Sequence, residues 1–132
     1  MGVQQRAGRA FRVFLKHFVN PMTRRIAKSK HGPYALVRHV GRRSGTPYET
    51  PVRIAPIEGG FVIELTYGFG VDWYQNVIAA GGCTIVWHGH DYPIRHIEPI
   101  DAQTGREAFA FPVNWVMHAA NMQHFVKVTA GA

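Results

Sequence analysis

The 132-residue sequence predicts a mainly β fold of the α+β class, a small β-barrel with an N-terminal amphipathic helix and further helices packed outside it. From residue 34 onward the chain consists mostly of short β-rich runs bounded by Gly, Pro or Asp. Five or six short, mostly antiparallel strands would leave exposed edges in an open sheet, so closure into a barrel is expected. The length suits a single domain with one hydrophobic core.

Residues 1–30 form the predicted N-terminal basic helical segment, and residues 31–132 form the predicted barrel domain. Within residues 3–19, Ala, Val and Phe side chains recur at helical spacing, and four basic side chains lie on the opposite face. Asn20 followed by Pro21 is typical of a helix cap and first turn, and predicts a second short helix to about Lys28.

The predicted strands of the barrel cover residues 34–40, 47–56, 61–67, 83–88 and 91–98. The tripeptide Glu58-Gly59-Gly60 and the pair Gly89-His90 are expected to turn two hairpins.

Helices are expected between and after these strands. Residues 71–82 have an acid in the first turn, apolar residues at helical spacing and two closing glycines. Residues 101–111 predict a helix capped by Asp101, which Pro112 ends. A weak helix is expected over residues 113–122, and His124–Val128 could return as an edge strand.

The charge is unevenly distributed along the chain. Residues 1–53 hold twelve Lys or Arg and one acid, a net charge of +11, whereas residues 54–132 hold three bases and seven acids, a net charge of −4. An anionic partner is therefore expected at the first half.

Composition also narrows the class of protein and its expected location. No apolar run approaches the ~20 residues of a membrane-spanning helix, and a single cysteine, Cys83, excludes an internal disulfide. With no secretory pattern at the start, the expected location is the cytoplasm. Peripheral attachment to the inner face of the cell membrane through residues 3–19 is an alternative.

The turn "GRRSG" at residues 41–45 is the strongest functional signal. Main-chain amides of a Gly-rich turn can converge on an anion, a serine adds a hydroxyl donor, and arginine adds forked donors that suit phosphate or carboxylate oxygens. A solvated turn without a ligand is the competing interpretation for so short a motif.

The residues that follow give this turn its context. The run "GRRSGTPYETPV", a glycine hairpin and "FVIELTYGFGVDWYQNVIAAGGCTI" together resemble the deazaflavin (F-420)-dependent nitroreductase family over about residues 31–101. The resemblance implies a split β-barrel similar to the pyridoxamine-phosphate-oxidase and FMN-binding barrels. It also implies an oxidoreductase that uses coenzyme F-420, a deazaflavin with a phosphate and a polyglutamate tail, to transfer hydride to or from a small electrophilic or unsaturated substrate.

The same resemblance implies a set of cofactor-binding residues. The phosphate end would be held at the turn by Arg42, Arg43, Ser44, Gly45 and Thr46. The strand that passes the ring system would contribute Tyr48, Thr50, Pro51 and Val52. The end of the partner strand and the helix entry would contribute Thr66, Tyr67, Gly68, Val71, Asp72 and Trp73. Asn76 matches an asparagine of the family whose expected role is structural.

Other functions on this fold stay open. Some branches of the family bind lipids or fatty acids without catalysis, and an ordinary flavin enzyme would use FMN at the same basic turn. The helix over residues 3–19 could pack on the barrel or lie on an anionic membrane; nucleic acid is not expected as a partner, since no recognised binding module is present. A homodimer is expected by analogy with other split barrels.

No catalytic residue is assigned, because the cofactor would carry the hydride. Four side chains could face a substrate: Tyr67, Trp115, His118 and His124. The alternating His88 and His90, with His96, predict a hairpin rather than a metal site. Cys83 is expected to be a small buried apolar residue.

Overall fold

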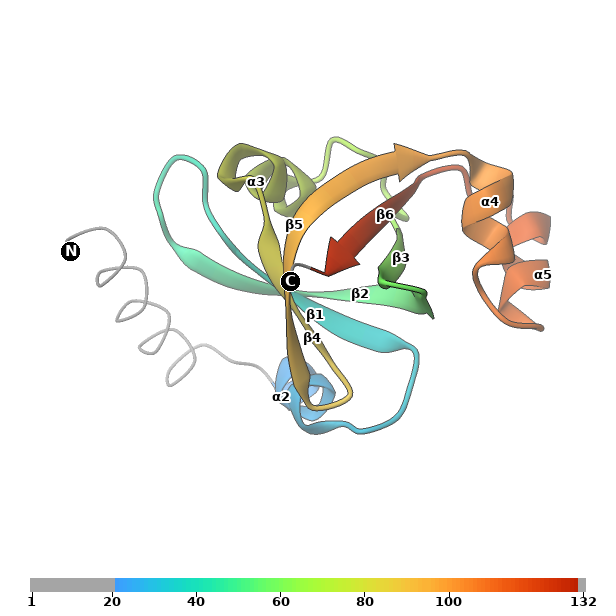
Figure 1. Cartoon of the computed structure of the whole chain (residues 1–132), viewed down its shortest axis with the longest axis horizontal. Coiled ribbons are helices and arrows are strands. Elements are labelled where there is room, and N and C mark those ends of the chain that lie inside the picture. The colour runs from blue at the N-terminus through green and yellow to red at the C-terminus, as the bar shows by residue number, and fades with distance from the viewer. Residues whose placement is uncertain (1–20, 131–132) are drawn as a thin grey trace.

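The computed structural model describes residues 21–130, in which six antiparallel strands close a barrel in the order β1-β2-β3-β6-β5-β4 (Figure 1). The helices are α2 (Pro21–Lys28), α3 (Asp72–Ala80), α4 (Ala102–Glu107) and α5 (Val113–Ala119). The strands are β1 (Tyr34–Val40), β2 (Pro47–Ile57), β3 (Gly60–Glu64), β4 (Cys83–Trp87), β5 (His90–Ile100) and β6 (Phe125–Ala130). The predicted mainly β barrel with peripheral helices is confirmed.

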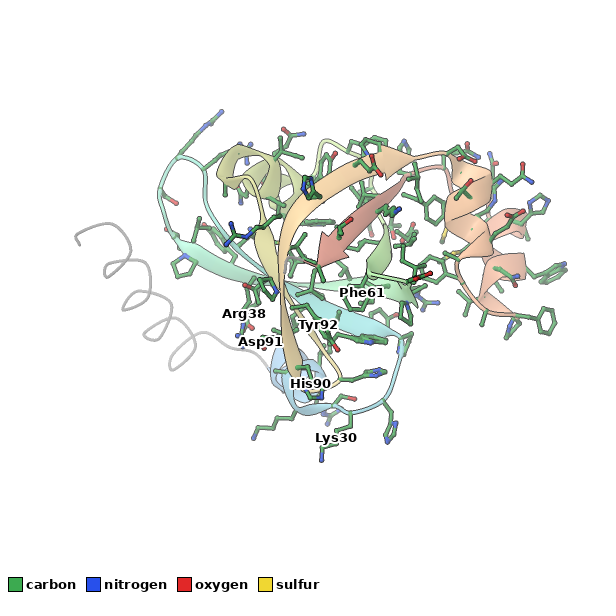
Figure 2. The ribbon with its side chains drawn as sticks, in the orientation of Figure 1. Lys30, Arg38, Phe61, His90, Asp91 and Tyr92 are labelled. Atoms are coloured by element: carbon green, nitrogen blue, oxygen red, sulfur yellow. The ribbon has the colours of Figure 1, made fainter. Side chains whose placement is uncertain are left out.

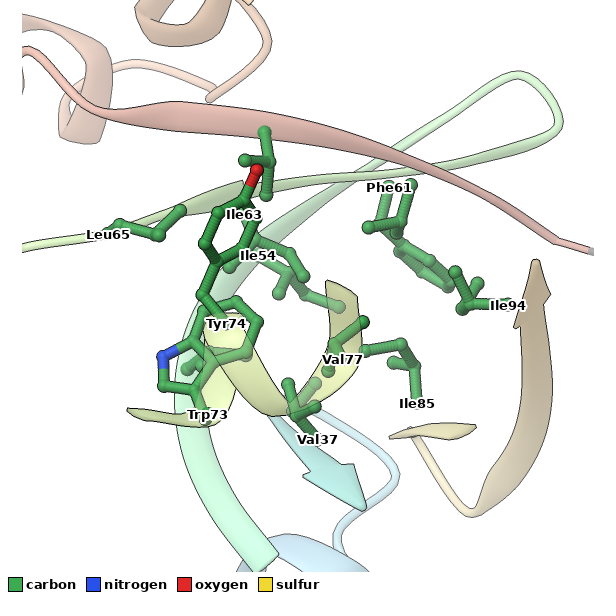
Figure 3. Close-up of a cluster of buried hydrophobic side chains, with 14 residues drawn as sticks. Val37, Ile54, Phe61, Ile63, Leu65, Trp73, Tyr74, Val77, Ile85 and Ile94 are labelled. Atoms are coloured by element: carbon green, nitrogen blue, oxygen red, sulfur yellow. The ribbon is translucent and has the colours of Figure 1, made fainter. Parts of the chain in front are cut away.

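The barrel interior is filled by side chains that alternate along the strands and by one helix. Val37 and Ile63 are among the fully buried residues of the interior cluster. Helix α3 adds Trp73, Tyr74 and Val77 to this cluster, and Figure 3 shows these three side chains pointing into it. Because α3 is anchored by its apolar face, it holds its polar residues at a fixed position beside β1.

Helix α3 ends where the sequence predicts. Gly81 adopts a left-handed conformation with φ 76°, and its N–H bonds to the carbonyls of Val77 and Ile78. This is the usual glycine-closed helix end. The short helix α2 is likewise confirmed and contacts β1, β2 and β4, while the helix predicted over residues 3–19 lies outside the described residues.

A second apolar cluster lies outside the barrel, under the α4–α5 pair seen at one end of Figure 1. Phe125 of β6 is fully buried there, in a cluster with Phe109 and Met117. Gly105 of α4 sits directly on this ring, since a Cβ at that position would lie 2.2 Å from Phe125 Cγ. The predicted cap of α4 is confirmed, because Asp101 accepts a hydrogen bond from the Thr104 amide at 3.0 Å.

Four sequence predictions need correction. The helix expected over residues 101–111 is shorter: it ends at Glu107, with Ala108 as its C-cap, and not at Pro112. β6 is not an edge strand: it pairs with both β3 and β5 and closes the barrel. β3 ends at Glu64 rather than at residue 67, because the Gly68 amide turns back to the carbonyl of Leu65 at 3.1 Å. The second hairpin turns at His88 and Gly89, one residue earlier than expected, with φ of 49° and 81°. The other strand ends agree within two residues, the usual uncertainty of such boundaries.

Candidate functional site

The turn at residues 41–46 is closed by its own backbone. The Gly41 amide donates to the Thr46 carbonyl at 2.8 Å, and the Gly45 amide donates to the Gly41 carbonyl at 2.9 Å. Gly45 has φ 70°, a conformation that side-chain-bearing residues adopt with strain. The Thr46 amide donates to Ser44 Oγ at 3.2 Å, so the top of the turn is held in a single shape.

Arg42 is fastened to helix α3, although part of its side chain is exposed. Its backbone N–H and its Nη1 both donate to Asn76 Oδ1, at 3.1 and 2.8 Å. Its Nη2 lies 3.3 Å from the carboxylate of Asp72. Asn76 is buried, so this side chain pins the turn at residues 41–46 to the helix, which fits the structural role expected for it.

Arg43 differs from its neighbour. It is exposed, and within residues 21–130 its guanidinium forms neither a hydrogen bond nor an ion pair. Of the two arginines of the turn, Arg43 is therefore the one whose charge remains available to an anionic ligand.

His39 continues the network on the barrel side, and sequence reasoning missed it. Its Nδ1 lies 3.1 Å from Asn76 Nδ2, its Nε2 lies 2.8 Å from Thr50 Oγ1, and its ring stacks on Tyr48 with centroids 5.6 Å apart. Burial lowers the pKa of His39 from 6.5 to about 4, against a smaller opposite effect of Asp72. The imidazole is therefore neutral at physiological pH.

Glu49, which follows the turn on β2, forms an ion pair with Arg38 on the neighbouring strand β1. Glu49, whose side chain is almost fully buried, accepts a hydrogen bond from Arg38 Nε at 3.1 Å. Arg38 also lies 3.5 Å from Asp91, and Figure 2 shows these two side chains next to each other. This pairing removes most of the repulsion that a bare carboxylate would exert on a bound anion.

These groups surround a polar cavity of about 540 Å³. It gathers seven of the residues that the family resemblance implied: Arg42, Arg43, Ser44, Tyr48, Thr50, Asp72 and Trp73. It also contains four that were not predicted as ligand contacts: His39, Gly41, Glu49 and Asn76. We refer to it as the polar cavity.

A second cavity of about 460 Å³ lies beside the first and is lined mainly by apolar side chains; we refer to it as the apolar cavity. It gathers the remaining predicted contacts that face a hollow: Pro51, Val52, Thr66, Tyr67 and Val71. Thr50 and Trp73 line both cavities. The two cavities are therefore neighbours on either side of these two residues.

One wall of the apolar cavity was not predicted. Helix α5 and the turn after it supply Val113, Val116, Met117 and Met122. Strand β3 adds Glu64, a buried acid that accepts a hydrogen bond from Thr66 Oγ1 at 2.7 Å. The helical spacing of the α5 residues was visible in the sequence, but the same spacing is expected of a helix that only packs on a core.

The remaining predicted contacts lie close to the cavities without lining them. Gly45 and Thr46 complete the turn, and Gly68 packs near the His124 ring, whose atoms are 3.8 Å from a Cβ built on the glycine. Of the suggested substrate-side groups, Tyr67 lines the apolar cavity, whereas Trp115 and His118 line a separate hollow beside α4.

The contacts of His88 and of Cys83 are those of residues that pack and stabilise the fold. The His88 ring stacks on Trp87, and its Nε2 lies 2.9 Å from the Gly32 carbonyl. Cys83 packs against the interior cluster, and burial raises the pKa of its thiol to about 12. Among residues 21–130, no three His, Cys, Asp or Glu side chains are grouped as a metal site would need.

Comparison with known proteins gives matches to solved structures. No protein-family model and no curated protein matches the sequence. The structure of an F420-H2 dependent reductase (FDR-A) matches with a TM-score of 0.54 at 16% identity, covering 73% of this chain and 93% of that chain. A chain described as a domain-swapped dimer matches with a TM-score of 0.53 at 13% identity, covering 98% of this chain and 99% of that chain.

A proposed 5-nitroimidazole antibiotic resistance protein from Bacteroides thetaiotaomicron matches with a TM-score of 0.50 at 10% identity, covering 87% of this chain and 81% of that chain. Identities this low establish the fold alone. The class of protein is therefore the split β-barrel, the fold of the F420-H2 dependent reductase, and the fold that the sequence resemblance implied is confirmed. Within residues 21–130, no helix is both long and apolar enough to span a bilayer.

Proposed function

We propose that this protein binds coenzyme F-420 and uses it to transfer hydride to or from a small electrophilic or unsaturated molecule. The observation that carries the proposal is the pair of adjacent cavities, one lined mostly by polar side chains with an available arginine and one lined mainly by apolar side chains, which share Thr50 and Trp73. A deazaflavin has the same division, with an anionic tail at one end and a planar ring at the other.

The residues present fit such a group. The turn offers a cation at Arg43 and a hydroxyl at Ser44, while Glu49 beside it is paired with Arg38. Arg42 would act mainly by holding the turn on α3, so the phosphate-binding role inferred for both arginines rests chiefly on Arg43. The ring would lie toward Pro51 and Val52, on the strand between the two cavities.

When bound, the deazaflavin would supply the hydride chemistry. The contribution of the chain is to hold the tail, orient the ring and exclude water. Trp73 is buried between the two cavities and would limit how far the ring can slide toward the polar end. The wall formed by Val116 and Met117 of α5 would pack against an apolar substrate.

Titration of the purified full-length protein with F-420, followed by cofactor fluorescence, tests the proposal. We expect saturable binding at micromolar concentrations and weaker binding of FMN, because only the deazaflavin tail adds several carboxylates. The affinity should fall as salt is raised, since the tail is held partly by charge. No binding of F-420 at tens of micromolar would contradict the proposal.

A carrier of lipid or fatty-acid chains is the second candidate function. The apolar lining of the cavity under α5 favours it, because four aliphatic or thioether side chains face that space. Mass spectrometry of the protein as purified distinguishes the two candidates. Co-purified acyl chains together with absent F-420 binding would support the carrier, and F-420 binding without acyl chains would support the oxidoreductase.

We also propose a homodimer, which the similarity to a chain described as a domain-swapped dimer supports. Light scattering after size-exclusion chromatography measures the mass directly. A mass near the 14.8 kDa of one chain at micromolar concentration would contradict the dimer.

A further inference from the structure

A chain of side-chain hydrogen bonds leads from the anion-binding turn to the point where the two cavities meet. Arg42 donates twice to Asn76 Oδ1, at 3.1 and 2.8 Å. Asn76 Nδ2 then lies 3.1 Å from His39 Nδ1, and His39 Nε2 lies 2.8 Å from Thr50 Oγ1. Thr50 is one of the two residues that line both cavities.

The direction of every bond in this chain follows from the first one. Arginine carries only donors, so the two Arg42 contacts require the oxygen of the Asn76 amide at that position. The amide nitrogen must then face His39 Nδ1, and because it donates, Nδ1 must accept. A neutral imidazole that accepts at Nδ1 carries its proton on Nε2 and donates it to Thr50 Oγ1.

This arrangement leaves the Thr50 hydroxyl as a hydrogen-bond donor. Its oxygen accepts from His39, and within residues 21–130 it has no second hydrogen-bond partner. Its own proton is directed away from His39 and is therefore available to an acceptor in the cavities that Thr50 lines.

We propose that His39 is a positioning residue: held as its Nε2–H tautomer by Asn76, it fixes the Thr50 hydroxyl as a hydrogen-bond donor where the two cavities meet. The site therefore takes a ligand that places an accepting atom, such as a carbonyl or phosphate oxygen or an unprotonated ring nitrogen, at that point. The identification of this ligand as a deazaflavin rests on the proposed function, whereas the tautomer does not.

The surroundings of His39 support this role. The residue is 8% exposed, and burial lowers its pKa to about 4, so the singly protonated ring that the geometry requires is the form present at neutral pH. The stacked Tyr48 ring holds the imidazole in the plane that both hydrogen bonds need. Asp72, whose charge acts on the ring, is already paired with Arg42, and Glu49, which lines the same cavity, is paired with Arg38.

The tautomer can be measured on the protein without any ligand. Long-range ¹H–¹⁵N correlation spectra of ¹⁵N-histidine-labelled full-length protein distinguish protonated from unprotonated ring nitrogens, and His39→Asn identifies the His39 signals among the eight histidines. We expect a single Nε2–H tautomer at pH 7. Asn76→Asp should place a proton on Nδ1, in the Nδ1–H tautomer or in the doubly protonated ring, because the new carboxylate oxygen requires a donor there. An Nδ1–H tautomer or an exchanging mixture in the unsubstituted protein would overturn the proposal.

Ligand affinity tests the second half of the proposal. The probes are F-420 and the deazaflavin riboside that lacks the phosphate and glutamate tail. Thr50→Val should weaken both about 2–10-fold, the value of one neutral hydrogen bond, and Thr50→Ser should retain most of the affinity. His39→Asn removes the Nε2 donor and should cost about as much as Thr50→Val. His39→Gln keeps an N–H at nearly the same place and should cost less.

The double variant His39→Asn/Thr50→Val separates positioning from general damage. If His39 acts through Thr50, the double variant binds the probes no more weakly than Thr50→Val alone. Additive losses would overturn the proposal. If neither probe binds the unsubstituted protein, the proposed function fails, and the tautomer measurement still decides whether His39 holds Thr50 as a donor.

Discussion

The two cavities share Thr50 and Trp73, yet they are built by different forces. The polar cavity is held by directional hydrogen bonds from the turn at residues 41–46 to α3. The apolar cavity is held by the packing of α4 and α5 on the outer cluster around Phe125. Directional bonds fix particular atoms in one arrangement, whereas packing fixes a volume and tolerates exchange of side chains of similar size.

This difference suggests a division of tasks. A group with a fixed charge pattern, such as a cofactor tail, is suited to the polar side, while a variable small molecule is suited to the apolar side. Two exposed aromatic residues, Phe111 and Trp115, also lie on the α4–α5 side, and their side chains are not fixed by packing. If the division is correct, substitutions on one side should leave the other side functional.

The largest effect on stability is expected from Gly105→Ala, which disturbs the packing of α4 on the outer cluster. In Gly105→Ala the new Cβ would lie 2.2 Å from Cγ and 2.5 Å from Cβ of the fully buried Phe125, so α4 or Phe125 must shift. We expect the free energy of unfolding to fall by about 3 kcal/mol, despite the higher helix propensity of alanine. Urea denaturation followed by circular dichroism measures it.

Gly70→Ala is the matched control, because no heavy atom lies within 4 Å of the added Cβ. Its unfolding free energy should stay within about 0.5 kcal/mol of the unsubstituted protein. F-420 should still bind Gly105→Ala under conditions where that protein is folded, since the polar cavity does not involve α4. Equal destabilisation of both variants would show that the contact with Phe125 is not the cause.

Much of the fold and part of the site could be predicted from the sequence. The strands and α3 were found because alternation, helical spacing and terminal glycines are local signals, as Gly81 illustrates. The turn at residues 41–45 was found because its residue types are unusual for a turn. His39 was missed because one histidine in an apolar strand gives no sign of its partners, which are 11 and 37 residues away.

The α5 wall and the closing strand could not be predicted for a related reason. Whether Met117 faces a cavity or a filled core depends on what packs opposite, and that is set by the tertiary structure. β6 was taken for an edge strand because its sequence does not reveal that both neighbours pair with it.

Asn76→Ala should disrupt the polar cavity, because the Asn76 side-chain amide joins Arg42 to His39. Asn76→Ala leaves the Arg42 amide and His39 Nδ1 without their partner in a largely buried place. We expect a loss of about 2 kcal/mol in unfolding free energy and a clear loss of F-420 affinity. Denaturation and fluorescence titration measure the two effects. A stable variant that binds F-420 normally would mean that the turn holds its shape without α3.

Acid should weaken the polar side selectively. The pKa of His39 is lowered to about 4, so the unfolded chain takes up a proton near pH 6.5 that the folded chain takes up only near pH 4. The unfolded state binds more protons in this window, and the stability that His39 contributes is intact above pH 6.5 and lost as the pH falls toward 4. After allowance for solvent screening, the loss is about 1–2 kcal/mol.

The contribution of His39 is isolated by comparison with His39→Gln. Unfolding free energies of both proteins are measured between pH 7.5 and pH 4, and the difference between them should shrink across this window by about the amount above. Parallel curves would show that His39 does not titrate differently in the folded chain.

The smallest expected effect on stability belongs to the exposed arginine of the turn. Arg43→Ala should change the unfolding free energy by less than about 0.5 kcal/mol, because Arg43 has no partner within residues 21–130, while F-420 affinity falls and becomes less dependent on salt. Affinity for the riboside without phosphate should not change. Arg42→Ala is the comparison: it should lower stability as well as affinity, since its contacts with Asn76 hold the turn on α3. If the two variants behaved alike, the turn would be a uniform basic surface rather than one anchoring residue beside one ligand-binding residue.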